Sequence, residues 1–115
     1  MRQNVIKEKS FTFALRIVKL AKYLQDEKKE FVLSRQILRS GTAIGALVRE
    51  AEHAQSKADF ISKMSIALKE ANETDYWIDL LYQSDYIKQD SYESIHPDIQ
   101  EIIKLLVAIV KTSKK

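Results

Sequence analysis

The sequence has no cysteine, one proline and two glycines among its 115 residues. Without cysteine there are no disulfides, thiolate metal sites or cysteine nucleophiles, which is compatible with a reducing compartment. Because proline and glycine mark turns and long loops, a chain with so few of them is expected to be nearly all helix. No apolar run approaches the roughly 18–20 residues that span a bilayer, and the charged first ten residues lack the apolar core of a signal peptide. These absences predict a cytoplasmic, all-α protein with no membrane partner.

Four helical segments can be identified, and the whole chain, residues 1–115, is expected to form one domain. The first two segments are predicted at about Ser10–Leu24 and Leu33–Ala54 from the helical spacing of their apolar residues. The third is predicted to follow an N-cap at Ser56 and to run to about Gln83. Since the connections are short, the helices should be neighbours in an antiparallel up-down-up-down four-helix bundle.

The fourth segment allows two predictions for its start. Asp90 or Ser91 can cap it early, in which case Pro97 would kink the helix. Alternatively, Pro97 lies in the first turn, where proline is tolerated. From Ile99 to Val110 the segment is apolar nearly all round.

The first segment, like the fourth, is more apolar than one side of a small bundle requires. Its apolar residues form two rows. The first row is Phe11, Leu15 and Val18, and the second is Phe13, Ile17, Leu20 and Leu24. One interpretation is deep burial in a tight bundle. We favour a second apolar surface for self-association, because exposed patches of that size are rare on soluble monomers.

Both glycines lie inside the second predicted helix, at Gly41 and Gly45. A mid-helix glycine costs about 1 kcal/mol against alanine. The usual compensation is close approach by another helix, so we predict a tight helix contact at Gly45.

Charge is divided unevenly along the chain. Residues 1–49 carry eleven Lys/Arg and four Asp/Glu, a net of +7, whereas residues 50–101 carry four and twelve, a net of −8. Residues 102–115 add four lysines and no acid, so the near-neutral total of +3 conceals a dipolar molecule. A basic wall is a candidate surface for a polyanion, and walls of opposite charge can also pair between subunits.

The basic residues of the first two helices and their connection are the strongest candidate site. Because the two helices are adjacent, their cations can merge into one patch that faces a phosphate backbone. The alternative is a solvated face with ion pairs to the acidic third helix of a neighbouring subunit. Tyr23 is the only ring nearby that is not core, so binding would be directed to the backbone rather than to bases. The predicted nucleic-acid-binding residues are Arg16, Lys19, Lys22, Lys28, Lys29, Arg35 and Arg39.

Two E-x-x-H pairs, Glu50/His53 and Glu93/His96, are of the type that binds metal in di-iron bundles. In an up-down bundle they fall at opposite ends, separated by a helix of about 20 residues or about 30 Å. They therefore cannot share a metal cluster, and each histidine is expected to be a surface or helix-end residue.

Glu70 and Glu73 are three residues apart on the third helix, a spacing that can place an acid and a base together. No second acid faces them and no glycine-rich loop offers a cofactor site, so we expect them to form ion pairs with Arg39 or Arg49, or a solvated face. The sequence thus predicts no catalytic residues, no metal, no cofactor and no small-molecule substrate.

The stretch from Leu38 to Leu81 resembles the proteins encoded in intervening sequences of bacterial 23S ribosomal RNA genes. The resemblance rests on Arg39, Ser40, the run Ile44–Ala46 with Glu50, and the run from Ala67 to Trp77. It extends from the FALRIV run of the first helix to the terminal VKTSK, and Pro97 departs from the family's uninterrupted fourth helix.

The resemblance implies a four-helix bundle assembled as a five-fold ring, and no established activity. A related branch comprises accessory proteins of diversity-generating retroelements, which work with a reverse transcriptase and nucleic acid. We therefore expect a non-enzymatic homo-oligomer, a pentamer by resemblance, that binds structured RNA through its basic surface. The alternative is a structural assembly module or protein–protein adaptor with no nucleic-acid ligand.

Overall fold

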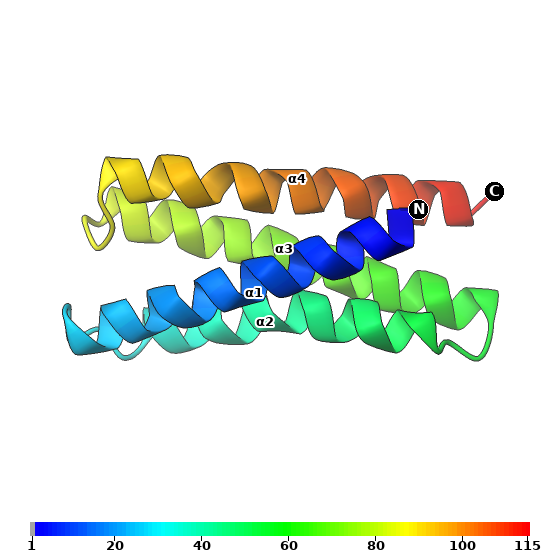
Figure 1. Cartoon of the computed structure of the whole chain (residues 1–115), viewed down its shortest axis with the longest axis horizontal. Coiled ribbons are helices and arrows are strands. Elements are labelled where there is room, and N and C mark those ends of the chain that lie inside the picture. The colour runs from blue at the N-terminus through cyan, green and yellow to red at the C-terminus, as the bar shows by residue number, and fades with distance from the viewer. Residues whose placement is uncertain (1) are drawn as a thin grey trace.

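The computed structural model describes residues 2–115, and side chains from Asn4 onward. Four long helices run alternately up and down along a body of 44 × 21 × 19 Å (Figure 1). Each packs against its neighbours in the chain, and α1 also contacts α4, which confirms the antiparallel four-helix bundle. No strand occurs in residues 2–115, and no helix there is long and apolar enough to cross a membrane. The helices are α1 (Arg2–Asp26), α2 (Leu33–Glu52), α3 (Lys57–Gln83) and α4 (Gln89–Ser113).

The predicted start of α3 is confirmed. The Ser56 hydroxyl accepts a hydrogen bond from the Asp59 backbone N–H at 3.0 Å, so one of the free donors at the helix end is satisfied. By contrast, α1 begins well before the predicted Ser10. Ile6 is fully buried, so the first turns of α1 are fixed by packing against the core.

The fourth helix takes the early start and continues through Pro97. Its N-cap residue is Lys88, without a side-chain cap, so neither Asp90 nor Ser91 plays the predicted capping role. Pro97 lies inside the helix, where it cannot donate to the carbonyl one turn earlier. Ile95 and Ile99 on either side of it are buried, so core packing holds the helix together across this position.

One stripe of each helix forms a shared core. The stripe is aliphatic at most positions, with Phe13 of α1 as the largest fully buried side chain. The fully buried large residues are Ile6, Phe13, Ile17 and Leu24 in α1, Ile37 and Ile44 in α2, Met64, Ile78 and Leu81 in α3, and Ile99, Ile102 and Leu106 in α4.

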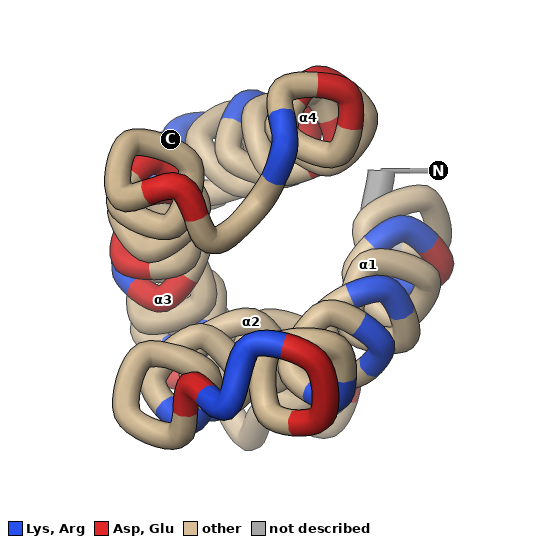
Figure 2. Tube along the Cα trace, turned by 90° about the vertical axis from the view of Figure 1, so that its left-hand side faces the viewer, with Lys and Arg blue, Asp and Glu red and all other residues tan. Residues whose placement is uncertain are grey.

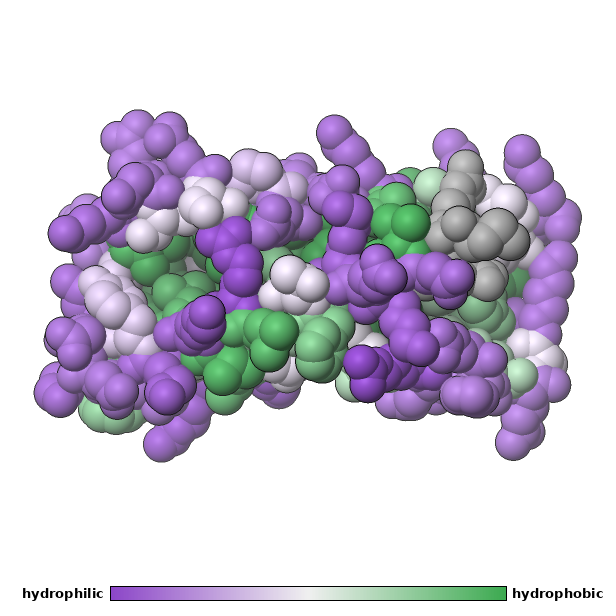
Figure 3. All heavy atoms as spheres, viewed as in Figure 1, coloured by the Kyte–Doolittle hydropathy of each residue, from purple (hydrophilic) through white to green (hydrophobic). Residues whose placement is uncertain are grey.

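The two apolar rows of α1 have different environments. The second row lies in or against the core, whereas Phe11, Leu15 and Val18 are 48%, 52% and 41% exposed. Figure 3 shows apolar side chains reaching the surface among polar ones on the face where α1 lies in front, with α4 above it and α2 below. Deep burial is therefore the wrong interpretation for this row of α1.

The contact between α1 and α2 is closest at Gly41 rather than at Gly45. A Cβ on Gly41 would lie 2.8 Å from Ile17 Cγ1, which is closer than van der Waals contact allows. Gly45 also faces α1, but a Cβ there would lie 3.5 Å from the Ser10 carbonyl oxygen, an ordinary contact. The sequence thus predicted the close approach on the correct helix, but at Gly45 instead of Gly41, which lies one turn earlier.

Candidate nucleic-acid interface

Much of the charge separation in the sequence is neutralised inside the molecule. The cations of residues 1–49 that form ion pairs all reach acids of residues 50–101, and each pair joins two neighbouring helices. Pairing within the chain therefore takes up charges that the sequence left available for other subunits. The pairs are Lys7–Glu52, Lys9–Glu101, Arg16–Asp98, and Arg39 with Glu70 and Glu73.

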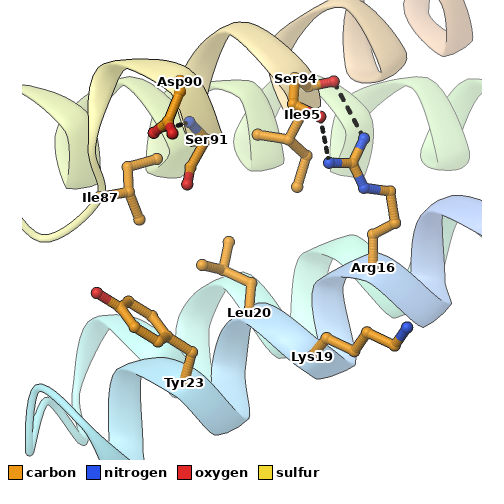
Figure 4. Close-up of a pocket in the computed structure, with 9 residues that line it drawn as sticks. All are labelled: Arg16, Lys19, Leu20, Tyr23, Ile87, Asp90, Ser91, Ser94 and Ile95. Atoms are coloured by element: carbon orange, nitrogen blue, oxygen red, sulfur yellow. Dashed lines mark hydrogen bonds between the residues drawn. The ribbon is translucent and has the colours of Figure 1, made fainter.

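Arg16 connects α1 to α4. Its Nη1 lies 2.6 Å from Asp98 Oδ2. Nη1 also donates to the Ser94 carbonyl oxygen at 3.0 Å, and Nη2 donates to Ser94 Oγ at 2.8 Å (Figure 4). A guanidinium with three such acceptors is held in place and already has a counter-charge. Arg16 is thus a helix-joining residue at the edge of the basic surface.

Arg39 has a similar role between α2 and α3. Its guanidinium pairs with Glu70 Oε1 at 3.0 Å and with the Glu73 carboxylate, which also accepts a hydrogen bond from Trp77 Nε1 at 2.9 Å. The prediction that Glu70 and Glu73 serve as ion-pair partners is confirmed for Arg39. Arg49 instead lies over the Phe11 ring, 5.0 Å from its centroid.

The other five predicted residues are exposed, and none forms an ion pair with a carboxylate of residues 4–115. They follow α1 toward its C-terminus, pass through the connection and reach the first turn of α2. In Figure 2, which views this end of the bundle, cations follow α1 and stand beside acidic residues at the connection. These five residues, which we call the unpaired basic surface, are Lys19, Lys22, Lys28, Lys29 and Arg35.

Glu30 shapes the connection that carries these cations. Its carboxylate accepts hydrogen bonds from the backbone N–H groups of Val32, Leu33 and Ser34 at 3.2, 3.0 and 2.8 Å. Burial alone would raise the pKa of Glu30, but the three backbone hydrogen bonds outweigh burial, and the pKa is lowered. A side chain outside the helix thus caps α2, a role that sequence reasoning missed because it treated QDEKKE as a plain polar connection.

A groove of about 490 Å³ lies beside this surface, between α1 and α4. In Figure 4, Leu20 and Tyr23 extend from α1 toward Ile87 and Ile95 on the opposite side. Tyr23 is 37% exposed, so one aromatic residue accompanies the cations. Sequence reasoning did not predict the groove, because its walls come from the first and last helices. It is lined by Arg16, Lys19, Leu20, Tyr23, Ile87, Asp90, Ser91, Ser94 and Ile95.

The two histidines have different environments. His53 is exposed at the C-cap of α2, as predicted. His96 is half-buried between α3 and α4, with Nε2 3.1 Å from Asp75 Oδ1, so the prediction of a surface or helix-end position is wrong for it. The sequence missed this contact because the helical phase that directs Asp75 toward α4 depends on packing.

Comparison with known proteins supports the resemblance found in the sequence. A family model described as 23S rRNA-intervening sequence protein matches residues 2–108. The chain is also similar to a crystal structure of a protein of unknown function from the S23 ribosomal protein family of Bacteroides thetaiotaomicron. The two are 62% identical over 96% of this chain and 99% of that one, with a TM-score of 0.94. No curated protein matches this sequence.

Proposed function

This chain belongs to the 23S rRNA-intervening sequence protein family, and the similar crystal structure is of a protein of unknown function. We propose that this chain is a non-enzymatic RNA-binding protein of the cytoplasm. The unpaired basic surface contacts the phosphate backbone of a structured RNA. The observation that carries this proposal is that five exposed cations close together in the chain have no carboxylate partner among residues 4–115.

Chemistry favours phosphate over base recognition. Lysine ammonium groups on exposed helix and loop positions attract phosphates without reading sequence. Tyr23 is the only ring that lines the groove beside Lys19, so stacking on several bases has no platform there. Binding should therefore depend strongly on salt and weakly on RNA sequence.

The proposal includes self-association, for which the exposed row Phe11, Leu15 and Val18 is the candidate contact. A ring of five copies, as the family resemblance implies, would repeat the unpaired basic surface around the assembly. Repetition matters because several weak phosphate contacts on one RNA reinforce one another. The runner-up function is a structural assembly module whose ligand is another protein.

The decisive experiment compares two double variants that remove the same charge. Lys19→Gln/Lys22→Gln alters the unpaired basic surface, whereas Lys69→Gln/Lys104→Gln alters exposed lysines of α3 and α4 that have no ion pair among residues 4–115. Glutamine is nearly as good a helix former as lysine, so helicity should be kept. A labelled RNA stem–loop is titrated with each protein at several salt concentrations.

We expect the first variant to weaken binding and to reduce the slope of log affinity against log salt by up to about 2, because each lysine that neutralises a phosphate adds about 1 to that slope. The control should retain the wild-type slope. Equal effects in the two variants would show that the net charge of the protein attracts the RNA and that the unpaired basic surface has no special role. A loss of assembly mass with RNA affinity per subunit unchanged would instead show that the two lysines pair with acids of a neighbouring copy.

A further inference from the structure

A polar cluster lies between α3 and α4, away from the unpaired basic surface. Asp75 and Asp79 are one turn apart on α3, and His96 extends from α4. One ligand atom from each lies within 4.8 Å of the other two. Among the residues that the structure describes, this is the one group of three such side chains that can converge on a metal ion.

The hydrogen bonds of the cluster leave one oxygen without a donor. The Gln100 amide nitrogen donates to Asp75 Oδ2 at 2.9 Å and also lies 3.4 Å from His96 Nε2. Metal binding needs the tautomer that carries its proton on Nδ1, because a neutral imidazole then has one free lone pair on Nε2. Asp75 Oδ1, 3.1 Å from Nε2, is then buried with no hydrogen-bond partner.

Two lone-pair atoms this close repel unless a proton or a metal ion lies between them. Two ligands at about 2.0–2.1 Å from a tetrahedral Zn²⁺ are separated by about 3.3 Å. The 3.1 Å between Asp75 Oδ1 and His96 Nε2 is close to that separation. A proton on Nε2 would join the same two atoms as a hydrogen bond, so a metal ion that binds here takes the place of that proton.

The charges of the cluster also favour a bound cation. Asp75 is half-buried, Asp79 one helical turn away is exposed, and His96 is the only one of the three that can carry a positive charge. These two carboxylates are thus short of positive charge. A divalent ion would neutralise both.

Outer residues already hold these ligands in position. The Tyr92 hydroxyl donates to Asp79 Oδ1 at 2.6 Å, and that hydrogen bond is the largest cause that raises the pKa of Tyr92 to about 12, so the hydroxyl stays a donor. The Tyr92 ring also stacks on His96, with centroids 4.8 Å apart and planes 16° from parallel. Metal-binding histidines and carboxylates are commonly oriented by such second partners.

We propose that Asp75, Asp79 and His96 bind one divalent transition-metal ion, with Zn²⁺ preferred and water completing the coordination. Imidazole and carboxylate donors suit this class of metal. The ion would tie α3 to α4, a role separate from RNA binding by α1 and α2.

The test uses the full-length chain without a histidine tag, freed of metal by a chelator. Calorimetric titration with ZnCl₂ should show one ion bound per chain, and Co²⁺ in its place should develop the visible absorption of a low-symmetry site. His96→Gln and Asp75→Asn should each lower the Zn²⁺ affinity at least tenfold. The matched control is His53→Gln, which removes the other histidine and should leave the affinity unchanged.

A folding control separates ligand loss from damage. In chelator, Asp75→Asn should melt at or above the wild-type temperature, because it removes a negative charge whose Oδ1 has no donor while Gln100 can still donate to the amide oxygen. Only wild type should gain stability when Zn²⁺ is added. Absence of binding, or equal affinity in wild type and His96→Gln, would overturn the proposal. It would also fail if nuclear magnetic resonance showed the His96 ring doubly protonated at neutral pH and insensitive to Zn²⁺.

Discussion

Glu30 determines how the connection between α1 and α2 is held. Its charge is stabilised in the folded protein by three backbone donors of α2, which together lower its pKa despite burial. A carboxylate with a lowered folded pKa adds stability above its unfolded pKa of about 4.3, and that stability is lost as the pH falls through the folded value.

Glu30→Gln should therefore lower the free energy of unfolding by about 1 kcal/mol at neutral pH, the usual size of a helix N-cap contribution. The difference from wild type should shrink as the pH falls below about 4, where the wild-type carboxyl also becomes neutral. Urea denaturation at several pH values measures both effects. Glu27→Gln is the matched control, since Glu27 is exposed and its side chain has no hydrogen bond among residues 4–115. Equal stability of Glu30→Gln and wild type at neutral pH would refute the capping role.

At the scale of the helices, substitutions at the two glycines of α2 allow the effect of helix propensity to be distinguished from the effect of helix packing. Alanine adds up to about 1 kcal/mol of helix propensity at either position. At Gly41 the new Cβ would meet Ile17 at 2.8 Å, and a β-branched side chain held in one rotamer cannot move aside easily. At Gly45 the new methyl would meet Ser10 at an ordinary distance of 3.5 Å.

We expect Gly41→Ala to lower the free energy of unfolding by about 1–3 kcal/mol, the usual effect of overpacking, and Gly45→Ala to leave it unchanged or raise it slightly. Thermal melts of the two variants beside wild type give the comparison. Changes of opposite sign in the free energy of unfolding would place the close approach of α1 at Gly41. Two variants that both stabilise would show that Ile17 moves aside at little cost.

The fourth helix shows how packing overrides a local signal. Proline inside a helix removes one hydrogen bond and can cost about 3 kcal/mol or more. Because Ile95, Ile99 and Ile102 must stay in the core on one stripe, continuing the helix through Pro97 preserves more burial than ending it there. The same early start brings Tyr92 and His96 beside α3.

For the whole molecule, the main questions are charge and assembly. Ion pairs from the basic first half to the acidic second half act as ties between neighbouring helices, as Arg16 does between α1 and α4. What remains for an external ligand is the unpaired basic surface. What remains for another copy of the chain is the exposed apolar row on α1.

Leu15 is 52% exposed, so Leu15→Ser should change the stability of a single chain little. If the apolar row joins copies, the same change should reduce the molar mass in solution, because it removes apolar area from the contact. Light scattering coupled to gel filtration, over a range of concentrations, measures this. Val107→Ser is the control on α4, at 42% exposure. A wild-type mass of 13.3 kDa at all concentrations would exclude self-association.

The sequence by itself determined the number of helices, the antiparallel order and the cap at Ser56. These features depend on apolar spacing and on contacts within about one helical turn, so they are written in short stretches of residues. The ion pairs of Glu70 and Glu73 with Arg39 could also be predicted from the sequence, because short connections make the second and third helices neighbours and leave few other cations within reach. The seven candidate cations were identifiable by composition alone.

Only the tertiary structure decided which of those cations are paired, where the α1–α4 groove lies, and that His96 meets Asp75. Each of these depends on how far every helix is rotated about its own axis. That rotation is fixed by mutual packing of all four apolar stripes, with contacts such as Gly41 against Ile17, and no single stretch of the chain specifies it. Residues more than 70 positions apart, such as Arg16 and Ser94, become partners only once that packing is complete.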